Sequence, residues 1–473
     1  MIVADNFSYN HSFFKIFEDL SKIPHGSGNT AAISKYCYDF AVRNGCEVTV
    51  DKIGNVVIKR SAGVGYENSK PVILQGHLDM VCEKTPDSTH DFTRDPLKLS
   101  FDGKYITAEN TTLGGDDGIA VAYVLALIED KELQLPPLEI LLTTDEETGL
   151  CGAIALDGSM LSGKTLINLD SEEEGTLLCG CAGGITANIS ADFEEQSVDG
   201  TVLRITLSGL AGGHSGCVIH KNHLNAAKVM AKLFNNSDIE FNLISLVSGS
   251  KLNAIPFNCV AEIFVTDFEG AIEKINSAFK SIEVISSDDQ PTLNLSITKK
   301  SAKALSVADS KKVFDFLDNI IDGVLKKGET GVITSLNTGV TTYKYGKLTC
   351  ETLIRSMDNA DITAVADKIS KFSDEYSFKC NLTDAYPAWE YNEVSPLRDK
   401  MVAVYEKVYG EKPVVATIHA GLECGIISEK ISGMDAVSIG PDLLDVHTVK
   451  ERLDVESAIR TWDYLIEVLK SLQ

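Results

Sequence analysis

The segment PVILQGHLDM (residues 71–80) decides the fold of this chain, because an apolar strand runs directly into a histidine and an aspartate. Two later segments, LEILLTTDEE (138–147) and TLINLD (165–170), have the same form. Short apolar runs are typical of strands in a sheet that is covered on both faces. Between the first two lies IAVAYVLALIED (119–130), which predicts a helix. Strands that alternate with helices indicate a doubly wound α/β sheet, whose ligands bind beyond the carboxyl ends of the strands.

The remaining sequence predicts a discontinuous catalytic domain. A helix from Asn29 or Thr30 to Gly45 and a hairpin around residues 52–54 precede the sheet. From about residue 185, strands with one polar face alternate with helices, and the pattern changes again near residue 390. Two helices follow there, at 396–409 and 455–471. We therefore expect an α/β domain with a mixed sheet, formed by residues 1–184 and 390–473, and an inserted α+β lid domain of residues 185–389.

The amino-acid composition argues against some classes of binding partner. The 473 residues include 68 acidic and 43 basic ones, for a net charge of -25, which argues against nucleic acid and anionic lipid as partners. The first twenty residues carry Asp5, Glu18 and Asp19 but no basic segment, so we expect no signal peptide. Eleven cysteines, including Cys179 and Cys181, are interpreted as reduced thiols. These features predict a cytoplasmic protein with no membrane partner.

Polar clusters stand where the apolar strands end. They are Gly76-His77-Leu78-Asp79, the glycine-rich loop Gly114–Gly118, Asp145-Glu146-Glu147 and Asp170, with His447 as a further candidate near the end of the sequence. Gathered at one sheet edge, these groups would repel one another unless a cation compensated them. Two histidines and three carboxylates can hold two divalent ions and leave a position open for water. One carboxylate must then bridge, and Asp116 in its glycine-rich loop has the freedom to do so.

Spacing suggests further roles. His77 and Asp79 are two residues apart on an extended segment and point the same way, which suits a ligand histidine held by an aspartate. Adjacent Glu146 and Glu147 suit a division between metal binding and proton transfer. The simpler interpretation is a structural histidine and solvated acidic loops, and we assign it to Asp117 and to the run 172–174. For the other clusters, their common position at one sheet edge favours the metal site.

Eight motifs, taken together, resemble a known family. They are GHLDMV (76–81), GGDDGIA (114–120), TTDEETG (143–149), NLDSEEEG (168–175), AGGHSG (211–216), LNAIP (252–256), HAGLECG (419–425) and HTVKERL (447–453). In this order they resemble the dinuclear zinc peptidases, which include carnosinases, peptidase T, bacterial glutamate carboxypeptidase and aminoacylase. Within the family, the stretch ENTTLGGDDGIA (109–120) and the large inserted domain are most similar to the bacterial aminoacyl-histidine dipeptidases.

The resemblance implies a role for each matching residue. Asp116 would bridge two ions, for which zinc is the expected metal, and cobalt and manganese accept similar ligands. The remaining ligands would be His77 and Asp170 for one ion, and Glu147 and His447 for the other. Asp79 would orient His77, Glu146 would be the general base, and a cis peptide would follow Asp116.

Five residues of the inserted domain and the C-terminal part would bind substrate. The resemblance gives His214 the stabilisation of the oxyanion, and Asn253 and Arg355 the binding of the substrate carboxylate. His419 and Gly421 would complete that pocket. A surface salt bridge is the alternative for Arg355. The implied activity is hydrolysis of dipeptides, of the Xaa-His kind such as β-alanyl-histidine.

Two other functions stay open at this point. One is an amidohydrolase of N-acyl or ureido amino acids, and the other is an inactive relative that serves as a binding or scaffold protein. The long lid could supply His214 within one chain, so the resemblance allows either a monomer or a homodimer.

Overall fold

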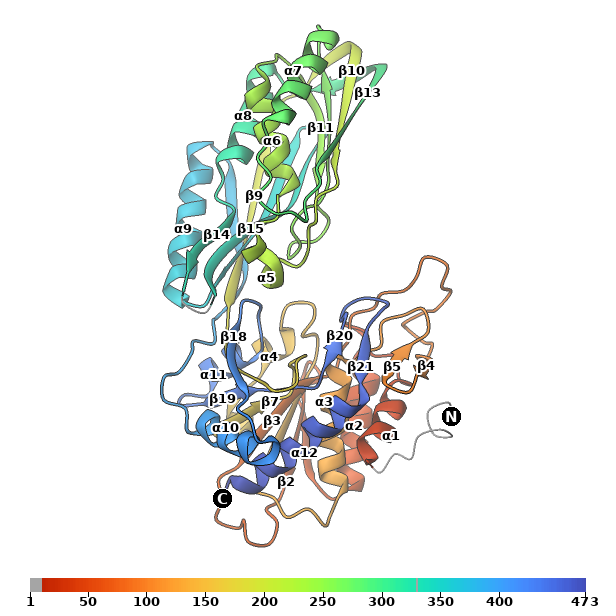
Figure 1. Cartoon of the computed structure of the whole chain (residues 1–473), viewed down its shortest axis with the longest axis vertical. Coiled ribbons are helices and arrows are strands. Elements are labelled where there is room, and N and C mark those ends of the chain that lie inside the picture. Colours follow the sequence, from red (N-terminus) through yellow and green to blue (C-terminus); the bar gives the residue numbers. More distant parts are fainter. Residues whose placement is uncertain (1–10, 329–330) are drawn as a thin grey trace. The chain divides into compact units, whose positions relative to one another are not determined.

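The computed structural model describes residues 11–328 and 331–473, which form two compact units (Figure 1). Unit 1 contains the described residues up to Cys181, Trp389–Thr417 and Leu422–Gln473. Unit 2 contains Ala182–Ala388 and Ile418–Gly421. The short segment 418–421, which carries His419 and Gly421, thus belongs to unit 2, whereas the sequence placed it in the catalytic domain.

Unit 1 is built on a mixed sheet of eight strands in the order β1-β2-β6-β3-β7-β19-β8-β18. β3 is parallel to both β6 and β7, whereas β2 is antiparallel to β6. Every residue of β3 and β6 is buried, as their apolar sequences predict. The strands are β1 (Glu47–Val50), β2 (Val56–Arg60), β3 (Val72–His77), β6 (Leu138–Thr143), β7 (Thr165–Asn168), β8 (Thr176–Cys181), β18 (Val414–Ile418) and β19 (Asp435–Ser438).

Helices pack on this sheet and bury apolar faces. In α3, every residue from Gly118 to Ile128 is buried, because the helix lies between β3 and α1. The first described helix begins at Ser12, and residues 1–10, including Asp5, lie outside the described residues. The helix predicted from Asn29 or Thr30 to Gly45 corresponds to Ala31–Arg43. The helices are α1 (Ser12–Leu20), α2 (Ala31–Arg43), α3 (Gly115–Glu129), α4 (Cys151–Ala155), α10 (Pro396–Tyr409), α11 (Cys424–Lys430) and α12 (Val455–Ser471), with a 3-10 turn η1 (Gly158–Met160).

A small second sheet of unit 1 was not predicted. Its four strands, in the order β20-β21-β5-β4, are only two to four residues long and lack a recognisable period. They are β4 (Leu99–Phe101), β5 (Tyr105–Ala108), β20 (Leu443–Leu444) and β21 (Arg452–Asp454). The loop between β20 and β21 carries His447.

Unit 2 is an α+β unit with a nine-stranded sheet in the order β13-β10-β12-β11-β15-β16-β9-β17, in which β14 also pairs with β15. Helices cover the sheet and enclose a core that includes the packed rings of Phe234, Phe241 and Phe314. The strands are β9 (Gly183–Asp192), β10 (Gln196–Ser208), β11 (Asn242–Ser248), β12 (Cys259–Phe264), β13 (Thr292–Ala304), β14 (Gly323–Lys327), β15 (Val332–Lys344), β16 (Lys347–Ser356) and β17 (Lys379–Tyr386). The helices are α5 (Ser215–Val218), η2 (Ile219–Lys221), α6 (Ala226–Ser237), α7 (Phe268–Lys280), α8 (Val307–Asn319) and α9 (Asn359–Glu375).

The cysteines and the helices can be compared with the expectations of reduced thiols and of no membrane partner. All eleven cysteines are free thiols. Within residues 11–328 and 331–473, no helix is both long and apolar enough to span a bilayer.

Candidate metal centre

Three parallel strands bring the predicted ligands to one edge of the unit 1 sheet. β3 ends at His77, which stands opposite Thr143 at the end of β6. Glu146 and Glu147 follow in the loop after β6, and Asp170 follows β7. Because the carboxyl ends of parallel strands meet at the same edge, segments that are distant in sequence converge there. Asp116 lies in the first turn of α3.

Asp116 stands at the centre of the cluster. Its Oδ1 is 3.0 Å from Nε2 of His77, and its Oδ2 is 3.0 Å from Nε2 of His447. Nε2 of His77 is also 3.7 Å from Oδ1 of Asp170, and Nε2 of His447 is 2.9 Å from Oε1 of Glu147. The structure therefore contains two groups of potential ligands that share Asp116, each with its ligand atoms within 4.8 Å of one another.

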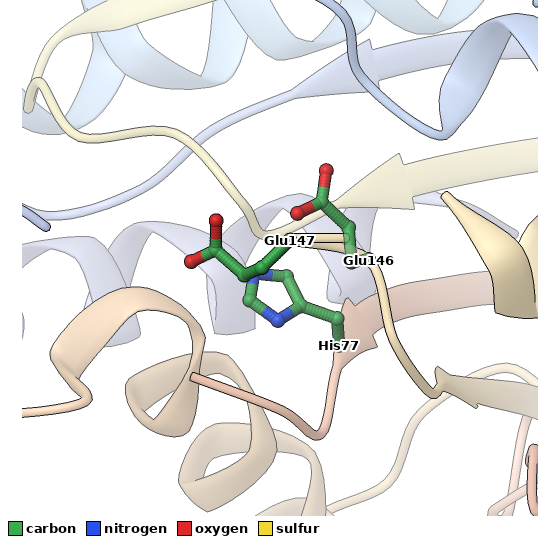
Figure 2. A group of neighbouring side chains, drawn as sticks. All are labelled: His77, Glu146 and Glu147. Atoms are coloured by element: carbon green, nitrogen blue, oxygen red, sulfur yellow. The ribbon is translucent and has the colours of Figure 1, made fainter. Parts of the chain in front are cut away.

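Glu146 and Glu147 lie beside the same histidine. Their carboxylates stand on one side of the imidazole ring of His77 (Figure 2) and form a third group with ligand atoms within 4.8 Å. The two adjacent glutamates thus lie within reach of the same group of potential ligands.

The spacing of these atoms fits divalent cations. Ligands about 2.1 Å from a tetrahedral zinc ion lie about 3.4 Å from each other, close to the separations of 2.9–3.7 Å found here. Oε1 of Glu147 is buried and has no partner in hydrogen-bonding geometry, even though Nε2 of His447 is 2.9 Å away. The two atoms can instead direct their lone pairs at a shared ion. Imidazole and carboxylate ligands suit zinc, cobalt and manganese.

The electrostatics of the cluster also indicate a site for divalent cations. Burial raises the pKa of Glu146 well above its ordinary value, and neighbouring carboxylates, Glu147 first among them, raise it further against the opposing effect of His77. Burial and carboxylate neighbours likewise raise the pKa of Asp170. Burial alone would lower the pKa of His447, but the adjacent carboxylates of Asp116 and Glu147 raise it to about 11. So dense a set of buried carboxylates needs positive charge, which divalent cations supply.

Asp79 organises two parts of the site. Nδ1 of His77 is 2.9 Å from the carbonyl oxygen of Asp79 and 3.6 Å from its Oδ1, so the main chain is the nearer partner of the ring. The carboxylate accepts the N–H groups of Glu146 at 2.9 Å and Glu147 at 3.3 Å. It also accepts the hydroxyl of Ser27 at 2.7 Å, a residue that sequence reasoning missed. Asp79 thus fixes the loop of the two glutamates as well as the ring of His77.

The prediction that Asp117 is a solvated acidic residue is wrong. Its side chain is only 2 % exposed, and Oδ2 accepts the backbone N–H of His77 at 3.1 Å. The sequence did not predict this hydrogen bond of Asp117, because sequence alone does not show which of two neighbouring carboxylates turns inward. The expected cis peptide between Asp116 and Asp117 is present. In the run 172–174, Glu174 is not simply solvated either, since it forms a two-point ion pair with Arg460 at 2.6 Å.

Two buried glutamates near the site were also missed. Glu423 is fully buried, and its Oε2 accepts the hydroxyl of Thr143 at 2.6 Å and the amide of Gln75 at 2.5 Å. Burial raises the pKa of Glu423 to about 7. Glu451 accepts backbone N–H groups from the loop of Asp116. Both residues stand inside motifs of the family resemblance, which was the only signal that could have drawn attention to them.

The five predicted substrate-binding residues all lie in unit 2, where they form a connected region. The N–H of Ser215 donates to the carbonyl of Asn253 at 2.8 Å, which joins the loop of His214 to that of Asn253. Nε2 of His419 is 2.7 Å from Oγ of Ser335, and Ser335 stands opposite Arg355 in the β15–β16 pair. At Gly421 a Cβ atom would lie 2.9 Å from the ring of Tyr386, so the position requires glycine.

Arg355 is not a surface residue, so the salt-bridge alternative is wrong. Its side chain is 6 % exposed, and Nη1 donates to the hydroxyl of Tyr386 at 3.2 Å. Nε is buried without a partner, and in the part of the chain that the structure describes no carboxylate pairs with this guanidinium. Burial, together with the charge of Arg355, lowers the pKa of His419 to about 4, so this imidazole is neutral. A buried guanidinium without a counter-ion is suited to bind an anionic group.

The sheet edge of unit 1 defines a class of protein, the metal-dependent hydrolases with paired ions. Comparison with known families makes the assignment narrower. The family described as Peptidase family M20/M25/M40 matches residues 73–471, and the chain belongs to this family. The family predicted from the eight motifs is thereby confirmed, and membership implies divalent metal ions.

Individual relatives are similar over nearly the whole chain. The cytosol non-specific dipeptidase of Escherichia coli (strain K12) is 36% identical in an alignment of 470 residues that covers 97% of this chain and 96% of the relative. The crystal structure of aminoacylhistidine dipeptidase from Vibrio alginolyticus matches with a TM-score of 0.82 and 33% identity, covering 98% of this chain and 96% of that one. Aminopeptidase PepT from Bacillus cereus, at 16% identity and a TM-score of 0.57, has the same fold.

Proposed function

We propose that this chain is a cytoplasmic dipeptidase that depends on two divalent ions, with zinc as the best-fitting metal. The observation that carries the proposal is the position of Asp116, whose two carboxylate oxygens each lie 3.0 Å from a different imidazole. His77 and Asp170 would hold one ion, Glu147 and His447 the other, and Asp116 would bridge them. Relatives named as dipeptidases, at 36% and 33% identity, support the reaction class.

The side chains around the ions divide the chemistry. Two bound divalent ions would supply an acidified water molecule and polarise the scissile carbonyl group. Glu146 would take the proton of that water and return it to the leaving amine. Burial raises its pKa, and a raised pKa favours a carboxyl group that both accepts and returns a proton. Asp79 would keep the loop of Glu146 in place through its hydrogen bond to the backbone N–H of that residue.

Unit 2 would recognise the substrate. The buried Arg355, which has no carboxylate partner among the described residues, would bind the terminal carboxylate of a dipeptide, and Asn253 would assist it. His214 would donate a hydrogen bond to the oxyanion. His419, neutral at physiological pH, and Gly421 would complete this region. We propose Xaa-His dipeptides such as β-alanyl-histidine as preferred substrates, in line with the aminoacylhistidine dipeptidase relative.

A substrate panel tests the proposal. The protein is stripped with a chelator, reconstituted with zinc, cobalt or manganese, and assayed on β-alanyl-histidine, alanyl-histidine, alanyl-alanine and N-acetyl-histidine. We expect metal-dependent hydrolysis of the dipeptides, fastest for the histidine-containing ones. Faster hydrolysis of N-acetyl-histidine would favour the amidohydrolase alternative. Metal binding without hydrolysis of any compound would favour an inactive relative.

A further inference from the structure

We propose that Glu451 is a positioning residue that holds the loop of the bridging ligand Asp116 in register with the loop of His447. The inference rests on the proposed two-metal function and concerns a side chain that is not itself a ligand. The carboxylate of Glu451 accepts four consecutive backbone N–H groups. Oε2 accepts those of Leu113 at 2.8 Å and Gly114 at 3.2 Å, and Oε1 accepts those of Gly115 at 2.8 Å and Asp116 at 3.3 Å.

This contact closes the N-terminal end of α3. Gly114 precedes the first residue of α3 in the left-handed conformation at φ 68°, and as a glycine it has no side chain that could accept these hydrogen bonds. Asp116 and Asp117 do not have helical backbone angles, so these four N–H groups belong to the turn that precedes the regular part of the helix. A buried peptide N–H group needs an acceptor, and the carboxylate of Glu451 supplies it. Glu451 makes these contacts from 335 or more residues away in the sequence, and it is only 3 % exposed.

The glycines of the loop make the approach possible. A Cβ atom on Gly115 would lie 2.7 Å from Leu443 and 3.3 Å from Oε1 of Glu451, so a side chain has no room there. The pair Gly114-Gly115 therefore lets successive peptide groups converge on one carboxylate, as in the backbone concavities that bind anions. The glycine-rich sequence thus allows the main chain to bind this internal carboxylate.

One side chain thus connects two ligand-bearing segments. Glu451 lies four residues after His447, and its N–H donates to the carbonyl of Thr448 at 3.1 Å, so Glu451 closes the turn that directly follows His447. Its carboxylate fixes the backbone of Asp116, whose two oxygens face His77 and His447. A shift of either segment would change the distance between Asp116 and His447, and metal sites are sensitive to the residues that orient their ligands.

Glu139 offers a matched control. It is a buried carboxylate of unit 1, 4 % exposed, and its Oε2 accepts the backbone N–H groups of Ser162 and Gly163, each at 2.8 Å. It stands near the start of β6, at the opposite end of the strand from Glu146. Loss of its charge should therefore affect folding in the same way as loss of the Glu451 charge. It should not displace any of the proposed metal ligands.

The test compares Glu451→Gln and Glu139→Gln in the full chain. Zinc affinity is measured by competition with a chromophoric chelator, and Tm is measured with and without zinc. We expect both variants to lower the Tm of the metal-free protein. Only Glu451→Gln should weaken zinc binding, by about 10- to 100-fold, and reduce the rise in Tm that zinc produces. Excess zinc should restore part of the lost kcat, with KM unchanged.

Each outcome bears on a separate claim. Zinc affinity of the wild-type level in Glu451→Gln, or an equal loss in Glu139→Gln, would overturn the positioning role while leaving the proposed function intact. If Glu451→Gln does not fold, Glu451→Asp, which keeps the charge on a shorter side chain, is measured in the same way. A wild-type protein that binds no zinc, cobalt or manganese would overturn the proposed function itself, and this inference with it.

Discussion

Oδ2 of Asp116 lies 3.0 Å from Nε2 of His447, a residue 331 positions later in the sequence. The other oxygen of Asp116 faces His77 at the same distance. A carboxylate shared in this way cannot be replaced by a group with a single oxygen without loss of one of the two contacts.

Replacement of Asp116 by asparagine should remove the bridge. The amide keeps the volume but offers one oxygen and no charge, so neither ion keeps its full ligand set. We expect metal affinity to fall by more than about 100-fold, beyond the loss typical of residues that only orient a ligand. Metal analysis after dialysis measures this, with the exposed Asp463→Asn as control. Retention of two ions per chain in Asp116→Asn would contradict the bridging role.

Glu146→Gln should separate catalysis from metal binding. Because Glu146 is assigned proton transfer and not ligation, we expect kcat to fall by about 10²- to 10⁴-fold with unchanged metal content. The neighbouring Asp145, whose Oδ1 accepts the N–H of Gly28, provides the control Asp145→Asn. Turnover near the wild-type rate in Glu146→Gln would show that another group accepts the proton.

Arg355→Ala should weaken recognition of the substrate carboxylate. A hydrogen bond to a charged group contributes about 1.5–3 kcal/mol, so kcat/KM for dipeptides should fall by at least about tenfold. Dipeptide amides, which lack the carboxylate, should be affected little. Arg204→Ala, at an exposed ion pair with Glu262, serves as control. An equal loss for dipeptides and their amides would indicate a structural role for Arg355.

Glu423→Gln should change how stability depends on pH. Burial raises the pKa of this carboxyl to about 7 from 4.5, so between these values the folded state binds more protons than the unfolded state. The stabilisation from the protonated carboxyl is complete below about pH 4.5 and is lost as the pH rises through about 7. The loss amounts to about 3 kcal/mol.

We therefore expect the glutamine variant, which remains neutral, to gain stability relative to the wild type between pH 5 and pH 8. Urea unfolding of the metal-free proteins across this range measures the difference. A constant difference in the free energy of unfolding across that range would mean that Glu423 does not titrate there.

The sequence predicted those features that local pattern determines. The apolar runs of β3, β6 and β7 identified the buried strands, and the parallel arrangement then placed His77, Glu147 and Asp170 at one edge. The helices Pro396–Tyr409 and Val455–Ser471 have the predicted bounds. His447, by contrast, acquired its assignment from the family resemblance, since no strand signal precedes it.

The missed features depend on contacts between distant segments. The strands of the small sheet, such as Leu443–Leu444, are too short to carry a period. Asp117 turns inward only because the end of β3 presents the N–H of His77 to it. Glu451 meets its partners across more than 330 residues, and Glu423 meets Thr143 across 280. No local pattern encodes such pairs.

Unit 1 is formed by segments on both sides of unit 2 in the sequence, and this order has a consequence for biosynthesis. All of Ala182–Ala388 is translated before the chain returns to supply Glu423, His447 and Glu451. A nascent or prematurely terminated chain therefore carries His77, Asp116 and Glu147 but lacks the second imidazole. Under the proposed ligand assignment, hydrolytic capacity would arise only after His447 has been synthesised, and fragments that stop earlier would lack it.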